Sequence, residues 1–449
     1  MLMSFSVKKC AILTCICALA LCFLGTTATA MPAFDIYKMS DMTGYDPNTY
    51  KNPEGDDVVK IGLLQIFSGP AAGNGEIFWA TCTWNAYDIN KRGGLMVDGK
   101  KKKVVILKGD TQGKPTTTKK EAEKLCLEEK VDVLWGTSGS HNCLVIQNVA
   151  KKYKTIFVNT LGLADTLMDG KNFNRYTFKT IQSTQMHGAA LAYFYSKRPE
   201  KKFYILNQDY VYGHDMAAGF KRGLKLYKPD AVIVGETYHP LFMKDIAPYV
   251  TKITASGAEV VFSSDWLPDG GNLLKTMREL GVNLPIANIY VDEPNALTAV
   301  GVEGTKGLVN QKDFLIGFDT PESTKWLTDW NNCWKTWSKP YDSQLYKWNS
   351  GTLGQVIEDT YWLFDVMERA GSTDPEKIIA TWEGDEYKAI SRVRKMRACD
   401  HHAVNDTFVT EYVFPNPFFD GMAAGKDIIR IPAEYCTHPI PEDLDRCKK

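Results

Sequence analysis

The amino-acid sequence predicts an α/β protein built from two doubly wound lobes, joined by a hinge and separated by a cleft. Residues 58–110 follow a strand, helix, strand pattern, which is typical of a parallel sheet with right-handed crossovers. The same alternation recurs as far as Gly281. The chain has 449 residues, more than one hydrophobic core usually holds, so we expect two lobes.

The first predicted unit begins with a buried strand at residues 58–64, an apolar run rich in β-branched side chains. A turn at residues 68–70 leads into a helix. Its apolar face recurs at helical spacing and consists of Ile77, Ala80, Trp84 and Tyr87. Gly93 and Gly94 end this helix, because glycine readily adopts the left-handed conformation found at helix ends. The next strand is predicted at residues 104–107.

The rest of the first lobe alternates in the same way. We expect helices at residues 119–129 and 143–152, and strands at residues 131–135 and 156–158. Residues 136–140, Gly-Thr-Ser-Gly-Ser, form a turn rich in hydroxyl groups between a strand and a helix. Doubly wound sheets bind ligands at turns after the carboxyl ends of their strands. A turn with hydroxyls and a helix start suits a carboxylate, although ordinary helix capping is the alternative.

The second half repeats the scheme, and the chain then returns to the first lobe. Helices are expected at residues 182–195, 214–227, 245–256 and 270–280, strands at residues 203–206, 232–234 and 259–263, and a loop at residues 207–213. Four tryptophans share one helical face, which we expect to be buried against the first lobe, with an aromatic ligand cage as the alternative. They are Trp326, Trp330, Trp334 and Trp337. A long helix at residues 355–370 and a strand at residues 408–413 follow.

Residues 1–30 have the pattern of a secretory signal peptide. Lys8 and Lys9 precede an apolar run at residues 11–24, and Ala28-Thr29-Ala30 gives a cleavage site. A membrane anchor is one alternative, but the run is short for a span. A lipoprotein signal at Cys22 is another, but the bulky Leu21 precedes it. We therefore expect export and cleavage after Ala30. No later window is long and apolar enough to cross a bilayer, so the mature chain is expected to be soluble.

The predicted organisation of the chain follows from these elements. It comprises a signal peptide at 1–30, an N-terminal arm at 31–57, a first lobe at 58–178 and 311–394, a second lobe at 179–310 and 395–430, and a C-terminal tail at 431–449.

Charge and motifs exclude several function classes. Lys+Arg and Asp+Glu number 53 each, and loss of two leader lysines leaves 51 minus 53, a net charge of −2. Without a basic excess, no nucleic-acid partner is expected. No nucleophile elbow, zinc-protease or P-loop motif occurs, so we predict neither an enzyme nor a cofactor. Cys399, His401 and His402 suggest a metal, but adjacent histidines point apart on a strand, and a turn with solvated histidines is the preferred interpretation.

Seven of the 11 cysteines remain after the leader is removed. Some should pair in an exported protein, and an odd number leaves at least one that is free or pairs between molecules. The C-terminal region is irregular and Pro-rich, so we expect a disulfide there, among Cys399, Cys436 and Cys447. Cys399 precedes a predicted strand and is the expected fixed partner, with Cys436 slightly favoured over Cys447.

Several local features together resemble one family. They resemble periplasmic substrate-binding proteins of branched-chain amino-acid type ABC importers. The features are Lys60-Ile61-Gly62 after a leader, Ser68-Gly69-Pro70 in the first turn, Tyr87-Asp88-Ile89-Asn90 before Gly93-Gly94, and the strand ending in Asp110. The run at residues 396–402 resembles the late crossover of the same family. The resemblance covers roughly residues 58–413.

The resemblance implies a set of ligand-binding residues. In the first lobe, the 136–140 turn would bind the ligand carboxylate through Ser138 and Ser140, and the backbone carbonyl of Leu161 would meet an amino group. Leu163 stands where the family often has a threonine, and leucine cannot supply that hydroxyl. In the second lobe, Tyr212 and Trp266 would cover the ligand. The family's acidic clamp falls within residues 289–293, on Tyr290, Asp292 or Glu293.

These features predict a periplasmic solute receptor of an ABC importer that closes like a Venus flytrap. The expected ligand is a small carboxylate, either a branched-chain amino acid or an apolar or aromatic acid. An ABC permease in the inner membrane would be the partner, and we expect a monomer. The alternatives are an extracellular ligand sensor module and an exported enzyme on a doubly wound scaffold.

Overall fold

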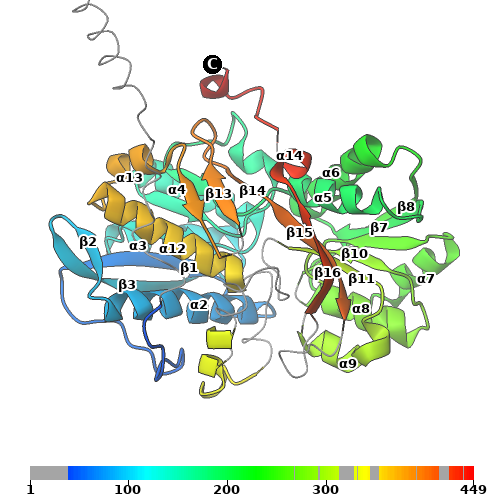
Figure 1. The fold of residues 1–449 in the computed structure, drawn as a ribbon, viewed down its shortest axis with the longest axis horizontal. Helices are drawn as coiled ribbons and strands as arrows, with labels where there is room; N and C mark the ends of the chain where they lie inside the picture. The colour runs from blue at the N-terminus through cyan, green and yellow to red at the C-terminus, as the bar shows by residue number, and fades with distance from the viewer. Residues whose placement is uncertain are drawn as a thin grey trace, which may run out of the picture. The chain divides into compact units, whose positions relative to one another are not determined.

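The structure is a computed structural model of the chain (Figure 1). It describes residues 39–448 except 267, 292–293, 313–327, 331, 344–352, 391, 414–423 and 438. Within these residues the chain forms two large sheets of mixed strand direction, each flanked by helices, as the sequence predicts.

The first sheet has six strands in the order β2-β3-β1-β4-β5-β6, and all neighbours are parallel except β2 and β3. The strands are β1 (Val58–Gln65), β2 (Leu95–Val97), β3 (Lys100–Asp110), β4 (Val133–Gly136), β5 (Ile156–Asn159) and β6 (Thr177–Lys179). The helices of this part are α2 (Ala72–Lys91), α3 (Pro115–Leu127), α4 (Ser140–Tyr153), η1 (Asp165–Met168), α12 (Leu353–Ala370) and α13 (Pro375–Trp382). We call this sheet and these helices the first lobe.

The second sheet has seven strands in the order β16-β15-β11-β10-β9-β7-β8, with β15 antiparallel to both of its neighbours. The strands are β7 (Lys202–Gln208), β8 (Val232–His239), β9 (Val260–Ser263), β10 (Ile286–Asn288), β11 (Leu308–Lys312), β15 (Thr407–Val413) and β16 (Ala424–Ile431). The helices are α5 (Thr184–Tyr195), α6 (Val211–Tyr227), α7 (Ala247–Ala255), α8 (Asp269–Glu279), α9 (Pro294–Gly304) and α14 (Ala433–Cys436). We call this part the second lobe.

A small antiparallel sheet completes the first lobe. It consists of β12 (Glu386–Lys388), β13 (Val393–Met396) and β14 (Ala403–Asn405). Tyr387, Met396 and Ala403 are buried in the same apolar cluster as Trp84 and Trp362, so this sheet packs on the first lobe. From β14 the chain passes directly through Asp406 into β15 of the second sheet.

The tryptophan-rich return of the chain is buried against the first lobe, as predicted for its described members. Trp330 and Trp337 are buried in the first-lobe cluster, Trp334 packs against it, and the Trp330 ring lies 4.7 Å from that of Trp84. Trp326 lies outside the described residues.

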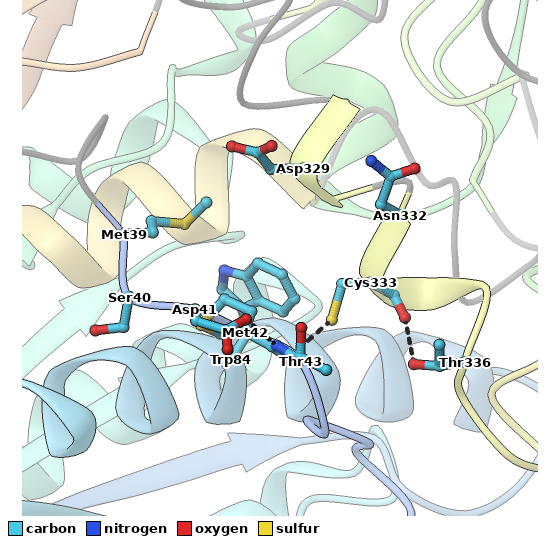
Figure 2. A pocket seen from close by; sticks show the side chains of 10 residues that line it. All are labelled: Met39, Ser40, Asp41, Met42, Thr43, Trp84, Asp329, Asn332, Cys333 and Thr336. Carbon is cyan, nitrogen blue, oxygen red and sulfur yellow. Dashed lines mark hydrogen bonds between the residues drawn. The ribbon is translucent and has the colours of Figure 1, made fainter.

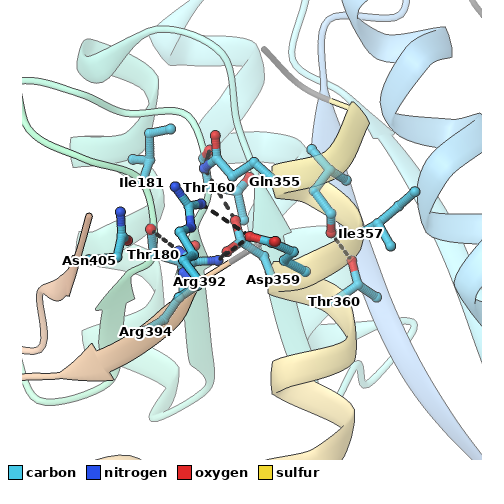
Figure 3. A network of polar contacts seen from close by, with 12 residues as sticks. Thr160, Thr180, Ile181, Gln355, Ile357, Asp359, Thr360, Arg392, Arg394 and Asn405 are labelled. Atoms are coloured by element: carbon cyan, nitrogen blue, oxygen red, sulfur yellow. Dashed lines mark hydrogen bonds and ion pairs between the residues drawn. The ribbon is translucent and has the colours of Figure 1, made fainter. Parts of the chain in front are cut away.

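Among the described residues, the chain passes between the lobes at Thr180, after β6, and at Asp406, before β15. Buried ion pairs with residues of α12 hold both of these crossings in place (Figure 3). Arg394 pairs with Asp359 and donates to the carbonyl oxygen of Thr180, where the chain leaves β6. Arg392 pairs with Glu358 at 3.1 Å and donates to the carbonyl oxygen of Asp406 at 3.4 Å. The side chains of both ion pairs are fully buried. A single helix of the first lobe therefore fixes both crossings.

The C-terminal segment carries a disulfide, but its partner differs from the favoured prediction. Cys399, in the loop between β13 and β14, is bonded to Cys447 in η2 (Asp445–Cys447). Cys436 lies outside this disulfide and is buried in the core of the second lobe. The preference for Cys436 was wrong because its side chain lies on the core-facing side of α14, and this burial keeps it from Cys399.

The interpretation of His401 and His402 as solvated is also wrong. Both side chains are buried. His401 Nε2 lies 2.7 Å from a carboxylate oxygen of Glu383, and its ring stacks on Phe178 with centroids 4.2 Å apart. His402 Nε2 donates to the carbonyl oxygen of Ile181 at 3.2 Å. These histidines fasten the β13–β14 loop to the first lobe and to the crossing beside it.

Candidate functional site

A cleft of about 420 Å³ opens where the loops after the parallel strands of the two sheets meet. The first lobe contributes the loops after β1, β3 and β4, and the second lobe those after β8 and β9. The lining residues are Ile66, Ser68, Gly69, Pro70, Ala71, Gln112, Gly113, Lys114, Ser138, Gly139, His141, Asn142, Leu241, Phe242 and Trp266. Both lobes are thus needed to form this cavity.

The first-lobe wall presents hydroxyl groups and the start of a helix. The Oγ of Ser138 is buried and has no hydrogen-bond partner among the described residues, and the Oγ1 of Thr137 is in the same state. Ser140 is the first residue of α4, and no described side chain caps that helix. Uncapped N–H groups and the positive end of the helix dipole favour an anion here.

Local backbone geometry makes this approach possible. Gly139 precedes α4 with a φ of 87°, a left-handed conformation that glycine adopts without strain. A Cβ at Gly139 would also lie 2.9 Å from the His141 ring, so a side chain would obstruct the wall. The carbonyl oxygen of the Gln65 side chain accepts from the N–H of Ser138 at 3.2 Å, which ties the turn to the end of β1.

The second-lobe wall is aromatic. The rings of Phe242 and Trp266 meet edge to face with centroids 5.8 Å apart. Trp266 Nε1 donates to the hydroxyl oxygen of Tyr210 at 3.0 Å, which fixes the orientation of the indole. The Tyr210 ring in turn lies 6.1 Å from that of His141 in the first lobe. The two walls therefore touch at one edge of the cleft.

Buried polar groups behind this wall hold it in place. Phe242 has a φ of 61°, and its N–H donates to the Asp269 carboxylate at 2.8 Å. The same carboxylate accepts from Gln208 Nε2 at 2.7 Å. Beside Trp266, the Asp265 carboxylate lies 2.7 Å from His239 Nε2, and both side chains are fully buried. Burial alone would lower the pKa of His239, but the hydrogen bond and charge of Asp265 raise it to about 9.

The predicted ligand residues differ in where the structure places them. Ser138 and Trp266 line the cleft. Ser140 begins the adjoining helix, and its Oγ accepts from the N–H of Ala164 at 3.1 Å, which leaves its own hydrogen free to donate. Leu161 is partly buried and packs against the cores of both lobes.

Leu163, Tyr212 and Tyr290 are not among the residues that line the cavity. Leu163 is buried, and its carbonyl oxygen accepts from Lys179 Nζ at 2.9 Å. Tyr212 is buried, with its hydroxyl donating to the carbonyl oxygen of Ser264 at 2.9 Å. Tyr290 packs partly buried against the second-lobe core, with Lys312 Nζ 4.6 Å from its ring centre. Asp292 lies outside the described residues.

Sequence reasoning missed several cleft residues. His141 and Lys114 in the first lobe and Phe242 in the second line the cavity. Each follows a parallel strand by a few positions, and that position in the chain is the signal that could have identified them. Their types alone gave no such indication, because single histidines, lysines and phenylalanines occur in every kind of loop.

The charge of the lining favours an anion. Among the described residues that line the cleft, Lys114 is the charged side chain and none is acidic. The nearby Asp110 is not a lining residue, and its carboxylate accepts from Ser68 Oγ at 2.7 Å and from the N–H groups of Phe67 and Gln112 at 2.9 Å. The described cleft can therefore hold a carboxylate but offers no exposed acid to an ammonium group.

A second cavity, of about 330 Å³, lies on the outer side of α2 (Figure 2). It is lined by Met39, Ser40, Asp41, Met42, Thr43, Trp84, Asp329, Asn332, Cys333 and Thr336. Cys333 Sγ donates to the carbonyl oxygen of Met42 at 3.5 Å. Because every described lining residue belongs to the N-terminal arm or the first lobe, this cavity does not lie between the lobes.

No group of three metal-binding side chains is found among the described residues. In particular, His401 and His402 already bond to Glu383 and to the backbone. Within the same part of the chain, no helix is long and apolar enough to cross a membrane.

Comparison with known proteins gives one family. The sequence model described as "Periplasmic binding protein" matches residues 58–416. The chain is 24% identical over 251 residues to "Leu/Ile/Val-binding protein homolog 4" of Brucella abortus, a match that covers 54% of this chain and 59% of that protein. It is 28% identical over 257 residues to "Amino acid binding protein" of Pseudomonas aeruginosa, covering 56% and 66%. The matches thus span less than two thirds of these curated relatives.

Solved structures share the fold. A leucine-, isoleucine-, valine-, threonine- and alanine-binding protein from Brucella ovis in its closed conformation superposes with a TM-score of 0.72 at 19% identity, covering 86% of this chain and 98% of that one. A Rhodopseudomonas palustris solute-binding protein in complex with 4-hydroxybenzoate gives a TM-score of 0.70 at 19% identity, covering 88% and 100%. At such identities the likeness shows the fold alone.

Proposed function

Because the chain belongs to the periplasmic binding protein family, we propose that it is the solute receptor of an ABC importer. Its ligand is a small carboxylate with an apolar or aromatic body, captured in the cleft between the lobes. The loaded receptor then presents its ligand to an ABC permease in the inner membrane as a monomer.

Binding proceeds by closure of the two lobes. A ligand that contacts both walls binds the closed conformation more tightly than the open one. The difference between these two binding free energies is the amount by which the ligand favours the closed conformation. The carboxylate is held by Ser138, Ser140 and the first turn of α4. The body of the ligand lies against Phe242 and Trp266. Leu161, Leu163, Tyr212, Tyr290 and Asp292 remain proposed ligand contacts.

One observation carries this proposal: the buried Ser138 Oγ, which has no hydrogen-bond partner in the described part of the chain, lies across a shared cavity from an aromatic wall. A buried hydroxyl without a partner is destabilising, and a ligand oxygen would satisfy it. The aromatic surface contributes mainly to ligands that bring a ring or an alkyl chain.

The choice between amino acids and plain acids rests on the ammonium group. A buried ammonium without acceptors costs several kcal/mol, and none of the described cleft-lining residues is acidic. The structural relatives include proteins named for branched-chain amino acids and proteins in complex with 4-hydroxybenzoate or benzoate. We therefore propose an aromatic or apolar acid ahead of an α-amino acid.

A thermal-shift screen tests this proposal. Leucine, isoleucine and valine are compared with 4-methylpentanoate, benzoate and 4-hydroxybenzoate, and hits are measured by calorimetry. We expect stabilisation by the acids that lack the amine. Tight binding of leucine with no response to any plain acid would falsify this preference while keeping the receptor function.

We further propose export with removal of residues 1–30, on the basis of the leader pattern. Mass spectrometry of the protein secreted into the periplasm should give Met31 as the first residue. A mature chain that begins elsewhere, or retains its leader in the cytoplasm, would contradict this.

A further inference from the structure

The last residues of the chain are attached to both lobes, and we propose that they form a covalent tether that restricts the relative motion of the lobes. We call residues 432–448 the C-terminal strap. The proposal rests on the lobe closure proposed above, but it concerns a segment that lies beyond the family match, which ends at residue 416.

One end of the strap is packed on the second lobe. The Tyr435 ring stacks on that of Tyr193 in α5 with centroids 4.6 Å apart, and its carbonyl oxygen accepts from the hydroxyl of Tyr227 in α6 at 2.7 Å. Cys436 is buried in the second-lobe core. In Figure 1, α14 lies beside α5, as these contacts require.

The other end of the strap is fastened to the first lobe. Cys447 is bonded to Cys399, and Arg446 Nη2 donates to the carbonyl oxygen of Ala398 at 2.7 Å and to Glu383 at 2.5 Å. Arg446 also lies 5.1 Å over the ring of Phe173. Asp443 passes so close to Gly170 that a Cβ there would lie 2.3 Å from the Asp443 carbonyl oxygen.

The connection between the two anchored ends of the strap is short. Only seven residue steps separate Cys436 in one lobe from Asp443 on the other, and seven extended residues reach at most about 25 Å. A disulfide, unlike the hydrogen bonds around it, does not open on the timescale of domain motion. The lobes can therefore move apart or rotate only within the range that this short segment allows.

The two lobes are in addition connected at the crossings on α12, which act as the pivot. A tether that joins α14 of the second lobe to Gly170 and Cys399 of the first lobe restricts angles that the crossings themselves leave free. Its removal should therefore broaden the distribution of distances between the lobes in the ligand-free protein, without removing any residue that lines the cleft.

The experiment measures that distribution by pulsed electron resonance in the full mature chain. Spin labels are placed on a non-natural amino acid at Lys120 in α3 and Lys252 in α7, both exposed. The Cys399→Ser/Cys447→Ser double variant is compared with wild type. Arg446→Gln is the matched control, because it loses contacts at the same anchor but keeps the disulfide.

A second variant tests the tether even if the double cysteine variant does not fold. An insertion of eight Gly and Ser residues between Pro441 and Glu442 lengthens the strap by up to roughly 28 Å and leaves the disulfide in place. We expect a broader distribution in the insertion variant and in the double variant, and an unchanged one in Arg446→Gln.

Equal distributions in wild type and the insertion variant would overturn the tether. The narrowing of the distance distribution on addition of 4-hydroxybenzoate, benzoate or leucine is measured in the same samples. This narrowing reports lobe closure separately from the tether. If the insertion leaves the distribution unchanged but the protein still closes on its ligand, the tether alone is refuted. If the protein does not close with any of the compounds, the proposed function is refuted.

Discussion

The hydroxyl of Ser138 offers the most direct test of the cleft at the scale of single residues. Its Oγ is buried without a partner among the described residues. Ser138→Ala should weaken binding of the preferred carboxylate by about 1–3 kcal/mol, the usual value of a hydrogen bond to a charged group. Calorimetry measures this, with Ser256→Ala on the far side of the second lobe as the control. Equal affinity in Ser138→Ala and wild type would mean that the carboxylate binds elsewhere.

Trp266 should discriminate between ligand bodies. Its loss in Trp266→Ala should weaken ring-bearing acids more than aliphatic ones of the same size, by about 0.5–1.5 kcal/mol. Trp266→Phe keeps a ring but removes the donor to Tyr210, so it should restore most of the difference. If Trp266→Ala weakens both ligand types equally, the indole does not face the ligand ring.

Glu383 links stability to pH. Hydrogen bonds from His401 and then Arg446 lower the pKa of Glu383 from 4.5 to about 2. Because the folded state favours the ionised carboxylate, its stabilisation is complete above pH 4.5 and is lost as the pH falls from 4.5 to 2. Urea unfolding of wild type and Glu383→Gln should therefore differ most at neutral pH and converge toward pH 2. A difference that does not depend on pH would contradict this assignment.

Residue-level prediction from sequence had a clear limit. Ser138 and Trp266 were selected and line the cleft. Tyr212 was selected for the same role, but the structure buries its ring and gives its hydroxyl to Ser264. His141 and Phe242 were not selected. A sequence pattern places a loop at the end of a strand, but the direction of each side chain depends on tertiary contacts that a single sequence does not contain.

At the scale of elements, α12 carries the ion pairs that fix the two crossings. Asp359→Leu would remove the nearer of the two buried carboxylates that pair with Arg394, the other being Glu358 at 3.9 Å. It should destabilise the protein by up to about 3–5 kcal/mol. The double variant Asp359→Leu/Arg394→Met removes both charges and should recover much of that loss. Urea denaturation of the single and double variants completes the cycle. A double variant as unstable as Asp359→Leu would show that the pair contributes more than mutual neutralisation.

Most elements were predictable because hydrophobic periodicity reports burial directly. The exceptions have local causes. Residues 207–213 were expected to form a loop, but α6 begins at Val211. There Gly213 approaches the carbonyl oxygen of Gln208 so closely that a Cβ would lie 2.0 Å from it, so the glycine marks a tight contact and not a turn. The strand β2 has only three residues, too few for a periodic signal.

At the scale of the whole molecule, two α/β lobes and their family were predicted from the order of elements and a few short motifs. The disulfide partner was not, because Cys436 and Cys447 follow Cys399 by 37 and 48 residues, and separation in the sequence does not decide between them. The choice depends on which face of α14 packs on the second lobe. That is a tertiary fact, and the periodicity of four residues cannot supply it.

The interleaving of the lobes has a consequence for biosynthesis. The first lobe needs α12, whose Ile357 carbonyl oxygen accepts from Asn85 in α2 at 2.9 Å, and the second sheet needs β15 beside β11. Neither core can therefore be completed until most of the polypeptide has left the ribosome. Contacts of such long sequence separation form slowly, so the chain would still be unfolded when the export proposed above requires it to pass through a secretion channel. On the same proposal, the Cys399–Cys447 bond can form only after Cys447 itself has crossed the membrane.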